Sequence, residues 1–225
     1  MNNKEKPFQR TKKPWPTKDA MEQVYAMNLW GGETSSYYSG NGSHDPEAVQ
    51  PYIAALSTFL SAFEQPLTVC DLGCGDFNVG KELVGYAKKY IAVDIVPDLI
   101  AHNKERFMNK NLEFRCLDIA VDELPDGDCA IVRQVLQHLS NAEVGAVVRK
   151  LYGYKYVVLT EHIPEGDFTP NMDIISGQGI RIKKQSGLNL LHPPFNLKIK
   201  EEKQLVSVLS NDHKGKIVTT LYTVF

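Results

Sequence analysis

The feature that most constrains the fold is the stretch 69–78, which reads Val-Cys-Asp-Leu-Gly-Cys-Gly-Asp-Phe-Asn. The apolar run 67–72 predicts a short buried strand that contains Asp71 and ends at a glycine pair, Gly73 and Gly75. Apolar residues at helical spacing follow, namely Val79, Leu83, Val84 and Ala87. A strand, a tight glycine turn and the start of a helix form a site where the backbone can approach a ligand closely.

The charge of this turn limits which ligand it can accept. Asp71 and Asp76 make the turn acidic, and no lysine stands where a phosphate-binding loop needs one. A pyrophosphate would be repelled here, whereas hydroxyls, an amine or a positive centre would not. The turn therefore indicates a nucleoside that lacks phosphates and has cationic character.

Strand-like and helical patterns alternate along the rest of the chain. Further strands are predicted at 90–95, 112–117, 129–135 and 156–160. This alternation implies a parallel sheet with right-handed crossovers. Two alternating segments, 204–209 and 216–225, indicate an antiparallel hairpin at the sheet edge. We therefore predict an α/β fold: a Rossmann-like, doubly wound, mostly parallel seven-stranded sheet with a C-terminal antiparallel hairpin.

The segments before and after this alternation suggest the domain organisation. Residues 1–16 are rich in lysine, arginine and proline and are expected to form a disordered basic arm. Residues 17–65 are expected to form an N-terminal helical cap and lid loop, with a helix over 19–29 and another that starts at Asp45–Pro46 and is kinked or restarted at Pro51. Residues 66–225 are expected to form the ligand-binding domain. Its segment 163–197 lacks periodicity and is expected to be an irregular substrate insert.

Acidic residues stand at the ends of three consecutive predicted strands: Asp71, Asp94 and Asp118. Ligands of open α/β sheets bind at the carboxyl ends of the strands. Asp94 follows Asp71 by 23 residues, the spacing at which an acid meets ribose hydroxyls in such folds. One such acid alone would be a loop or cap residue, but three at equivalent ends favour a shared site.

The stretch 69–78 resembles the first motif of class I S-adenosylmethionine-dependent methyltransferases, with Phe77 where that family has a third glycine. The resemblance implies S-adenosyl-L-methionine as cofactor. It implies that Asp94 accepts from the ribose hydroxyls, Asp118 from the adenine amine, and that Gln134 lies near the sulfonium. The full set of cofactor-binding residues that we expect is Asp71, Gly73, Gly75, Asp76, Asn78, Asp94, Ile95, Asp118, Ile119 and Gln134.

A narrower resemblance extends from about residue 28 to the end. The chain is similar to a small methyltransferase family in its Trp-Gly pair at 30–31, its Ser-Gly-Asn-Gly-Ser run at 39–43, its Cys-Gly-Asp-Phe-Asn run at 74–78, its Leu-Gln-His-Leu-Ser run at 136–140, and the segments 173–177 and 193–195. That family has no well-defined substrate as a whole, and some members are associated with glycan or secondary metabolism.

Three residues are candidates for a catalytic role: His138, Glu161 and His162. They follow the fourth and fifth predicted strands, and a histidine can take a proton near neutral pH. His138 could instead be a turn residue that caps the next helix or contacts the cofactor. Glu161 and His162 could bind substrate rather than act as bases.

Aromatic and polar residues of the loop and the insert are candidates for substrate contact: Trp30, Tyr37, Tyr38, His44, Arg181 and Phe195. The aromatic side chains could form a lid or could pack beneath the loop. His44 could be structural. No pair of ligands has the helical spacing of a metal motif, so we expect no metal.

Composition narrows the remaining classes. The net charge of −2 argues against nucleic acid as a partner. No run of about 18 apolar residues and no signal-peptide pattern is present, so a cytoplasmic protein without membrane contact is expected. The four cysteines form no Cys-x-x-Cys pair and are expected to be core thiols. A monomer or homodimer with a small-molecule substrate is expected.

The leading hypothesis is a methyltransferase that acts on a small polar metabolite or saccharide, with oxygen as the expected acceptor atom. The fourth strand ends in Arg-Gln-Val-Leu at 133–136 and not in the Asn/Asp-Pro-Pro-aromatic motif of amino-group methylation. The alternatives are a protein or RNA methyltransferase and a non-catalytic binding protein that retains the fold. A nicotinamide-dependent oxidoreductase is disfavoured by the acidic turn.

Overall fold

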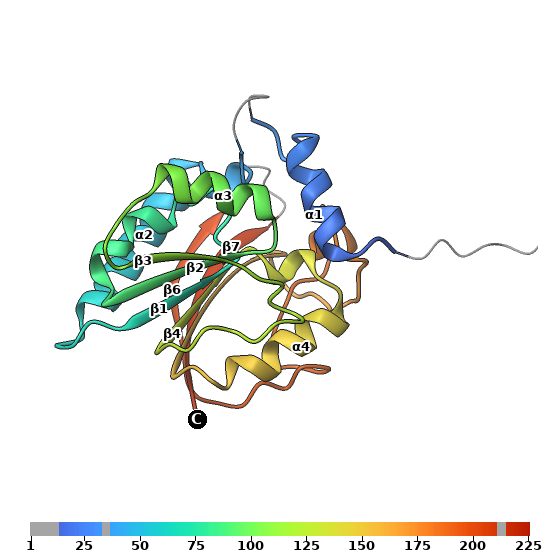
Figure 1. Ribbon diagram of the computed structural model, residues 1–225. Helices are drawn as coiled ribbons and strands as arrows, with labels where there is room; N and C mark the ends of the chain where they lie inside the picture. The colour runs from blue at the N-terminus through green and yellow to red at the C-terminus, as the bar shows by residue number, and fades with distance from the viewer. Residues whose placement is uncertain (1–13, 33–36, 211–214) are drawn as a thin grey trace, which may run out of the picture.

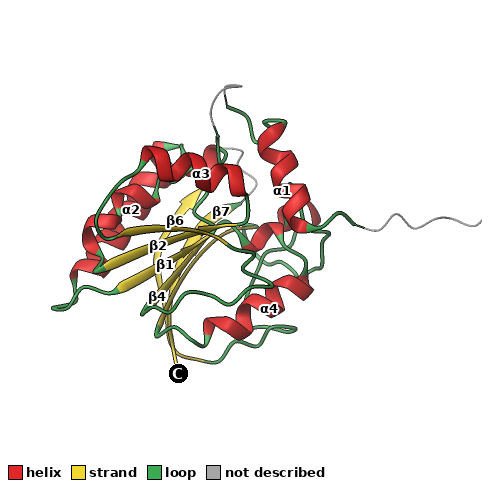
Figure 2. Ribbon diagram, in the orientation of Figure 1, coloured by secondary structure: helices red, strands yellow, loops and turns green. Residues whose placement is uncertain are grey.

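A computed structural model describes residues 14–32, 37–210 and 215–225. Most of the predicted arm 1–16 and part of the predicted lid loop therefore lie outside the described residues. The chain folds around one seven-stranded sheet with the order β3-β2-β1-β4-β5-β7-β6. Figure 2 shows this twisted sheet with helices on both of its faces.

The strands are β1 (Thr68–Leu72), β2 (Lys89–Asp94), β3 (Leu112–Cys116), β4 (Cys129–Arg133), β5 (Tyr156–Ile163), β6 (Ile199–Leu209) and β7 (Lys216–Val224). The pairs β1–β2, β1–β4, β2–β3 and β4–β5 are parallel. The pairs β5–β7 and β6–β7 are antiparallel. The order reverses between β1 and β4, so a crevice opens there at the carboxyl edge. The predicted fold class is confirmed.

The helices are α1 (Thr17–Ala26), α2 (Pro46–Ser61), α3 (Pro97–Arg106) and α4 (Asn141–Leu151). Two predicted start signals are present in the structure. The Asp45 carboxylate accepts from the Glu47 backbone N–H, and Ser140 with Glu143 forms a capping box. The α2 helix runs without a break through Pro51, so the predicted restart does not occur there.

Each face of the sheet has its own apolar core. Side chains of α4 pack on one face with alternate residues of β1, β4 and β5. Side chains of α2 and α3 pack on the other face, and Figure 1 shows α2 and α3 on the side opposite α4. The α1 helix lies apart from both: its Met21 packs against Val96 and Leu99 at the start of α3. It therefore covers an edge of the sheet rather than a face.

The helix expected after the glycine turn does not form. Two short 3-10 turns, η2 (Gly80–Glu82) and η3 (Val84–Tyr86), take its place. The expected apolar residues are still buried: Val79, Leu83, Val84 and Ala87. Phe77, at the position of the third glycine, is fully buried and has a φ of 61°. Its ring packs edge-on against Phe107 and Phe114, so this residue anchors the shortened segment to the core.

No helix in the described part of the chain is long and apolar enough to cross a membrane. All four cysteines are free thiols. Cys70 and Cys129 are buried, Cys74 is half-buried and Cys116 is exposed. The expectation of core thiols therefore holds for the first two and is wrong for Cys116.

Candidate functional site

A cavity of about 450 Å³ opens at the carboxyl edge of the sheet. Its walls come from the ends of β1 to β5, from α1, from the loop 37–45 and from the insert. Most of the residues predicted to bind the cofactor line it: Asp71, Gly73, Gly75, Asp76, Asp94, Ile95, Asp118, Ile119 and Gln134. The structure thus brings the three strand-end aspartates to one cavity.

Asp94 is positioned by backbone amides, and its carboxylate can accept further hydrogen bonds from a ligand. Its Oδ2 accepts from Gly75 N–H at 3.0 Å and its Oδ1 from Val96 N–H at 3.1 Å. Burial raises the pKa of this carboxyl, and the amides oppose that effect. A carboxylate can accept about four hydrogen bonds, so two such bonds leave room for two hydroxyls. Asp118 is similarly held at Oδ1 by Ala120 N–H at 2.8 Å.

Asp71 lies deeper than the other two aspartates. Its Oδ2 accepts from the Tyr90 hydroxyl at 2.9 Å. Burial raises the pKa of Asp71 to about 7, and the Tyr90 hydrogen bond and the nearby Arg133 guanidinium lower it. Near neutral pH the Asp71 carboxyl group is therefore protonated in about half of the molecules.

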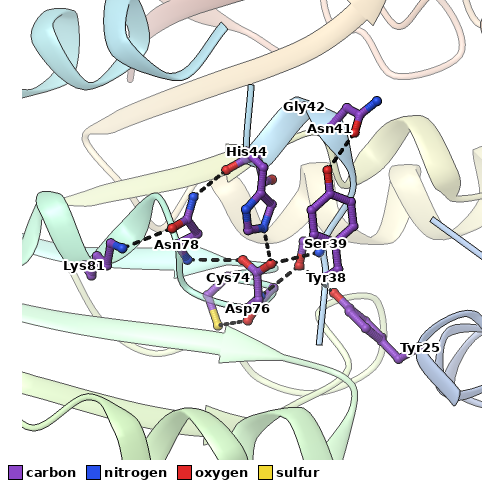
Figure 3. Close-up of polar contacts among 12 residues, drawn as sticks. Tyr25, Tyr38, Ser39, Asn41, Gly42, His44, Cys74, Asp76, Asn78 and Lys81 are labelled. Carbon is purple, nitrogen blue, oxygen red and sulfur yellow. Dashed lines mark hydrogen bonds and ion pairs between the residues drawn. The ribbon is translucent and has the colours of Figure 1, made fainter. Parts of the chain in front are cut away.

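The loop 37–45 closes over the glycine turn, and Asp76 holds it there (Figure 3). Asp76 Oδ2 accepts from Ser39 N–H at 2.8 Å and from His44 Nε2 at 2.6 Å. In return, Asp76 N–H donates to Ser39 Oγ at 2.8 Å. A Cβ on Gly75 would stand 2.4 Å from Ser39 Oγ, so the loop can close only on a glycine.

Asn78 and Arg133 fasten the other end of the same loop. Asn78 Nδ2 donates to Ser43 O at 2.8 Å. Arg133 donates to Gly42 O and to Ser43 Oγ, and its guanidinium lies over the Tyr52 ring. Asn78 does not line the cavity. The structure shows a contact of Asn78 to the loop, and its cofactor contact stays a prediction.

An aromatic cluster joins α1 to this loop. The Tyr25 hydroxyl lies 2.9 Å from Ser39 Oγ, and its ring meets Trp30 and Tyr37 edge-on. Trp30 lines the cavity and packs against His138 with ring centroids 5.3 Å apart. Thr17 of α1 donates to the Glu143 carboxylate of α4. The α1 helix therefore spans the cavity from α3 to α4.

The remaining aromatic and imidazole residues of the loop lie outside the cavity wall. Tyr37 packs on His102 of α3, with ring centroids 5.0 Å apart. Tyr38 stacks on His44, with centroids 4.3 Å apart, and donates to Asn41 Oδ1. Among the described residues of the wall, Tyr37, Tyr38 and His44 are absent. Their contacts support the loop, and their substrate contacts stay predictions.

Residues 69–154 match the family described as "Methyltransferase domain". Malonyl-[acyl-carrier protein] O-methyltransferase of Acetivibrio thermocellus is 34% identical over 88 residues, which are 38% of this chain and 30% of that protein. The chain carries a methyltransferase domain over residues 69–154. It spans less than a third of the length of that curated relative.

Solved structures share the fold of the methyltransferase domain at low identity. Magnesium protoporphyrin IX methyltransferase from Synechocystis with bound S-adenosylmethionine has a TM-score of 0.59 at 16% identity, over 94% of this chain and 99% of that one. The N-methyltransferase NodS from Bradyrhizobium japonicum with S-adenosylhomocysteine has a TM-score of 0.61 at 12% identity, over 91% and 99%. The [4+2]-cyclase SpnF has a TM-score of 0.58 at 14% identity, over 94% and 97%.

Within the methyltransferase domain, His138 has both ring nitrogens in contact with protein groups. Its Nδ1–H donates to Gly177 O at 3.1 Å, since a carbonyl can only accept. That tautomer leaves Nε2 as an acceptor, 3.4 Å from the Gln137 side-chain amide. Burial lowers the pKa of His138 to about 4. The imidazole is therefore neutral at physiological pH and fixed in one tautomer.

Glu161 and His162 do not act as a pair, because β5 continues through both of them. Successive residues of a strand point to opposite faces. His162 lines the cavity and its backbone N–H donates to Gln137 Oε1 at 3.0 Å. Glu161 is absent from the described cavity wall and is only 3% exposed. Burial raises the pKa of Glu161 to about 8, against the opposing charge of Arg181.

Arg181 and Phe195 are structural rather than part of the described cavity wall. Arg181 is 1% exposed and donates to three backbone carbonyls of the turn 136–139 and to Asn141 Oδ1 and Met172 O. Phe195 packs against the core on the α4 side. Arg181 fastens the insert to the turn that carries His138. The substrate contacts of Arg181 and Phe195 stay predictions.

Several residues of the site were not singled out from the sequence: Ser39, Arg133, Gln137 and Lys183. Arg133 could have been found, because a charged residue in the last position of a buried strand needs a partner or a cavity. The others come from loops that only tertiary contacts position. In the described ranges, no group of three or more His, Cys, Asp or Glu residues is arranged to hold a metal ion.

Proposed function

We propose that the methyltransferase domain transfers a methyl group from S-adenosyl-L-methionine to an oxygen atom of a small-molecule acceptor. The observation that carries this proposal is the single cavity that Asp94, Asp118 and the glycine turn share. The bound cofactor would supply a methyl group on a sulfonium, which is a good leaving group. The chain then has to position the acceptor and exclude water.

The residues of the cavity fit the parts of this cofactor. The free acceptor capacity of Asp94 suits two ribose hydroxyls, and Asp118 with Ile119 suits an adenine ring. The carboxylate of Asp71 and the bare backbone at Gly73 suit the amino-acid part. A Cβ at Gly73 would stand 2.3 Å from Val135, so this backbone leaves no room for a larger residue.

The segments outside the sheet have matching roles in this proposal. Residues 17–65 form the cap and lid, with the contacts of Ser39 and Asp76 closing the loop over the cofactor. Residues 163–197 contribute Gln178, Ile180 and Lys183 to the acceptor side of the cavity. An oxygen acceptor is favoured over an amine because the end of β4 reads Arg133–Gln134 and lacks the motif of amino-group methylation.

Asp94→Ala is expected to weaken binding of S-adenosylhomocysteine by about 1–3 kcal/mol, roughly 5- to 150-fold, because two hydroxyls lose a charged acceptor. Isothermal titration calorimetry on the full chain measures this directly. Asp167→Ala, an exposed aspartate of the insert, is the matched control and should bind like the parent protein. Unchanged affinity in Asp94→Ala would refute the assignment of Asp94, and no binding by the parent protein would refute the proposed function.

A further inference from the structure

The cavity is electrically divided along the order of the strands. On the β3-β2-β1 side its wall contains the aspartates at 118, 94 and 71. On the β4-β5-β7-β6 side the described wall contains Arg133, His162 and, from the turn η5 (Arg181–Lys184), Lys183. No aspartate or glutamate is among the described wall residues that come from β4 to β7, from the turn after β4 or from the insert.

The acidic side of the cavity suits a cofactor with a positive sulfonium. The methyl acceptor therefore binds on the side formed by β4 to β7. The one carboxyl that β5 carries, Glu161, follows Val157 and Leu159 in the strand alternation and lies on the α4 side of the sheet. Its raised pKa keeps it uncharged over most of the physiological range. Among their described residues, β4 to β7, the turn after β4 and the insert therefore bring no charged carboxylate to the acceptor side.

Apolar side chains complete the acceptor side. Ile180 of the insert, Leu209 at the end of β6 and Ile217 of β7 all line the cavity there. Lys183 is exposed as well as part of the wall, so its ammonium group stands at the rim. A ligand that fits this side has an apolar body and a negatively charged group.

The histidine nearest the end of β4 is a weak base, because burial lowers the pKa of His138 to about 4. His138 donates through Nδ1 to Gly177 O, and its Nε2 faces the Gln137 amide. An alcohol or sugar hydroxyl must lose a proton when it is methylated, and it therefore needs a base. An oxygen that is already ionised at neutral pH does not.

We propose that the acceptor is a small apolar carboxylic acid, methylated at its carboxylate oxygen to give a methyl ester. This proposal rests on the proposed function and narrows its substrate class. A carboxylate oxygen attacks the methyl carbon, the carbon–sulfur bond breaks, and its electron pair stays on sulfur. A new oxygen–carbon bond forms, the sulfonium becomes a neutral thioether, the carboxylate becomes a neutral ester, and no proton moves.

This reaction joins two opposite charges and leaves none. A site of low dielectric favours such a step, because the reacting ions lose their hydration on entry while the transition state is less charged. Lys183 at the rim attracts the carboxylate from solution. The aspartates on the other side of the cavity repel the acceptor carboxylate from the part of the cavity that suits the cofactor.

The test uses the full chain, radiolabelled S-adenosylmethionine and matched probes. Each pair consists of an alkyl or aryl monocarboxylic acid and the alcohol of the same skeleton, and simple sugars complete the panel. Methyl esters are recognised by release of labelled methanol in mild base. We expect label in acids and not in their alcohols. Label only in alcohols or sugars would overturn the proposal.

The variants Lys183→Met and Lys184→Met form a matched pair. Lys184 Nζ donates to Asp173 O at 2.8 Å and does not line the cavity. Lys183→Met is expected to raise KM for the acid about tenfold at low salt and less at 0.5 M salt, with kcat and cofactor affinity unchanged, because salt screens the lost attraction. Lys184→Met and Lys183→Arg should resemble the parent.

The two proposals fail in different ways. If S-adenosylhomocysteine does not bind, the proposed function is wrong. If it binds but no acid in the panel is methylated, and none shifts the melting temperature of the enzyme–S-adenosylhomocysteine complex, the acceptor assignment is wrong and the cofactor assignment stands. An equal KM for the acid in Lys183→Met and the parent would also refute the assignment.

Discussion

Phe77→Ala is expected to lower the free energy of unfolding by about 3–5 kcal/mol, because it removes a fully buried ring from a core. The ring meets Tyr90, Phe107 and Phe114 with centroid distances of 5.9, 5.3 and 4.9 Å. It also stabilises the segment where the expected helix is replaced by 3-10 turns, so little neighbouring structure can move in to fill the space. Urea denaturation followed by circular dichroism measures the change.

A second variant at this position separates packing from backbone strain. Phe77 has a φ of 61°, a conformation that costs an L-residue about 1–2 kcal/mol and costs glycine nothing. Phe77→Gly should therefore be less destabilising than Phe77→Ala by about 1 kcal/mol, the reverse of the usual order. Phe225→Ala, whose side chain is 70% exposed, is the control and should change stability little. Equal stability of Phe77→Ala and the parent would contradict the assigned role of the ring.

Glu161→Gln is expected to stabilise the protein above pH 8 relative to the parent, by about 5 kcal/mol, and to change its stability little near pH 4.5. The pKa of Glu161 is about 8 in the folded state, against an ordinary value of 4.5. The folded state therefore holds a proton that the unfolded state releases. The stability that this proton contributes is full below pH 4.5 and is lost as the pH rises to 8. Glutamine stays neutral throughout and removes this loss.

The measurement is the difference in unfolding free energy between the variant and the parent from pH 4.5 to pH 9. Subtracting the unfolding free energy of the parent removes the contributions of other groups. One of these is Asp71, whose pKa is raised to about 7 and whose ionisation also lowers stability as the pH rises. Glu64→Gln, at an exposed position, should give a flat difference. A flat difference for Glu161→Gln would show that this carboxyl is charged and paired in the folded protein.

The fold was predictable because its signals are local. Each parallel strand is a short apolar run, and helix starts are marked by residues such as Asp45 and Ser140, whose side chains cap the backbone. Parallel strands deliver their ends to one edge, so Asp94 and Asp118 could be placed in one cavity from spacing alone. The fold class and the methyltransferase family were correctly predicted for that reason.

The parts that were missed depend on contacts between distant segments. The role of Asp76 is set by a loop more than thirty residues earlier, and Arg181 by a turn more than forty residues earlier. The fifth strand is longer than its apolar run, and this extension sends Glu161 and His162 to opposite faces. The helix predicted after the glycine turn does not form, because the packing of Phe77 against the core outweighs the helical spacing of the apolar residues.

The walls of the cavity are distributed unevenly along the chain. The stretch 69–154 provides the floor, but Thr17, Met21 and Tyr25 of α1 and the run 39–43 all precede it, and Lys183 and Ile217 follow it. A shortened protein limited to that stretch would keep the aspartates and lose the lining residues that come from α1, from the run 39–43, from the insert and from β7. Its nucleoside would stand in bulk water, where a reactive sulfonium is open to hydrolysis.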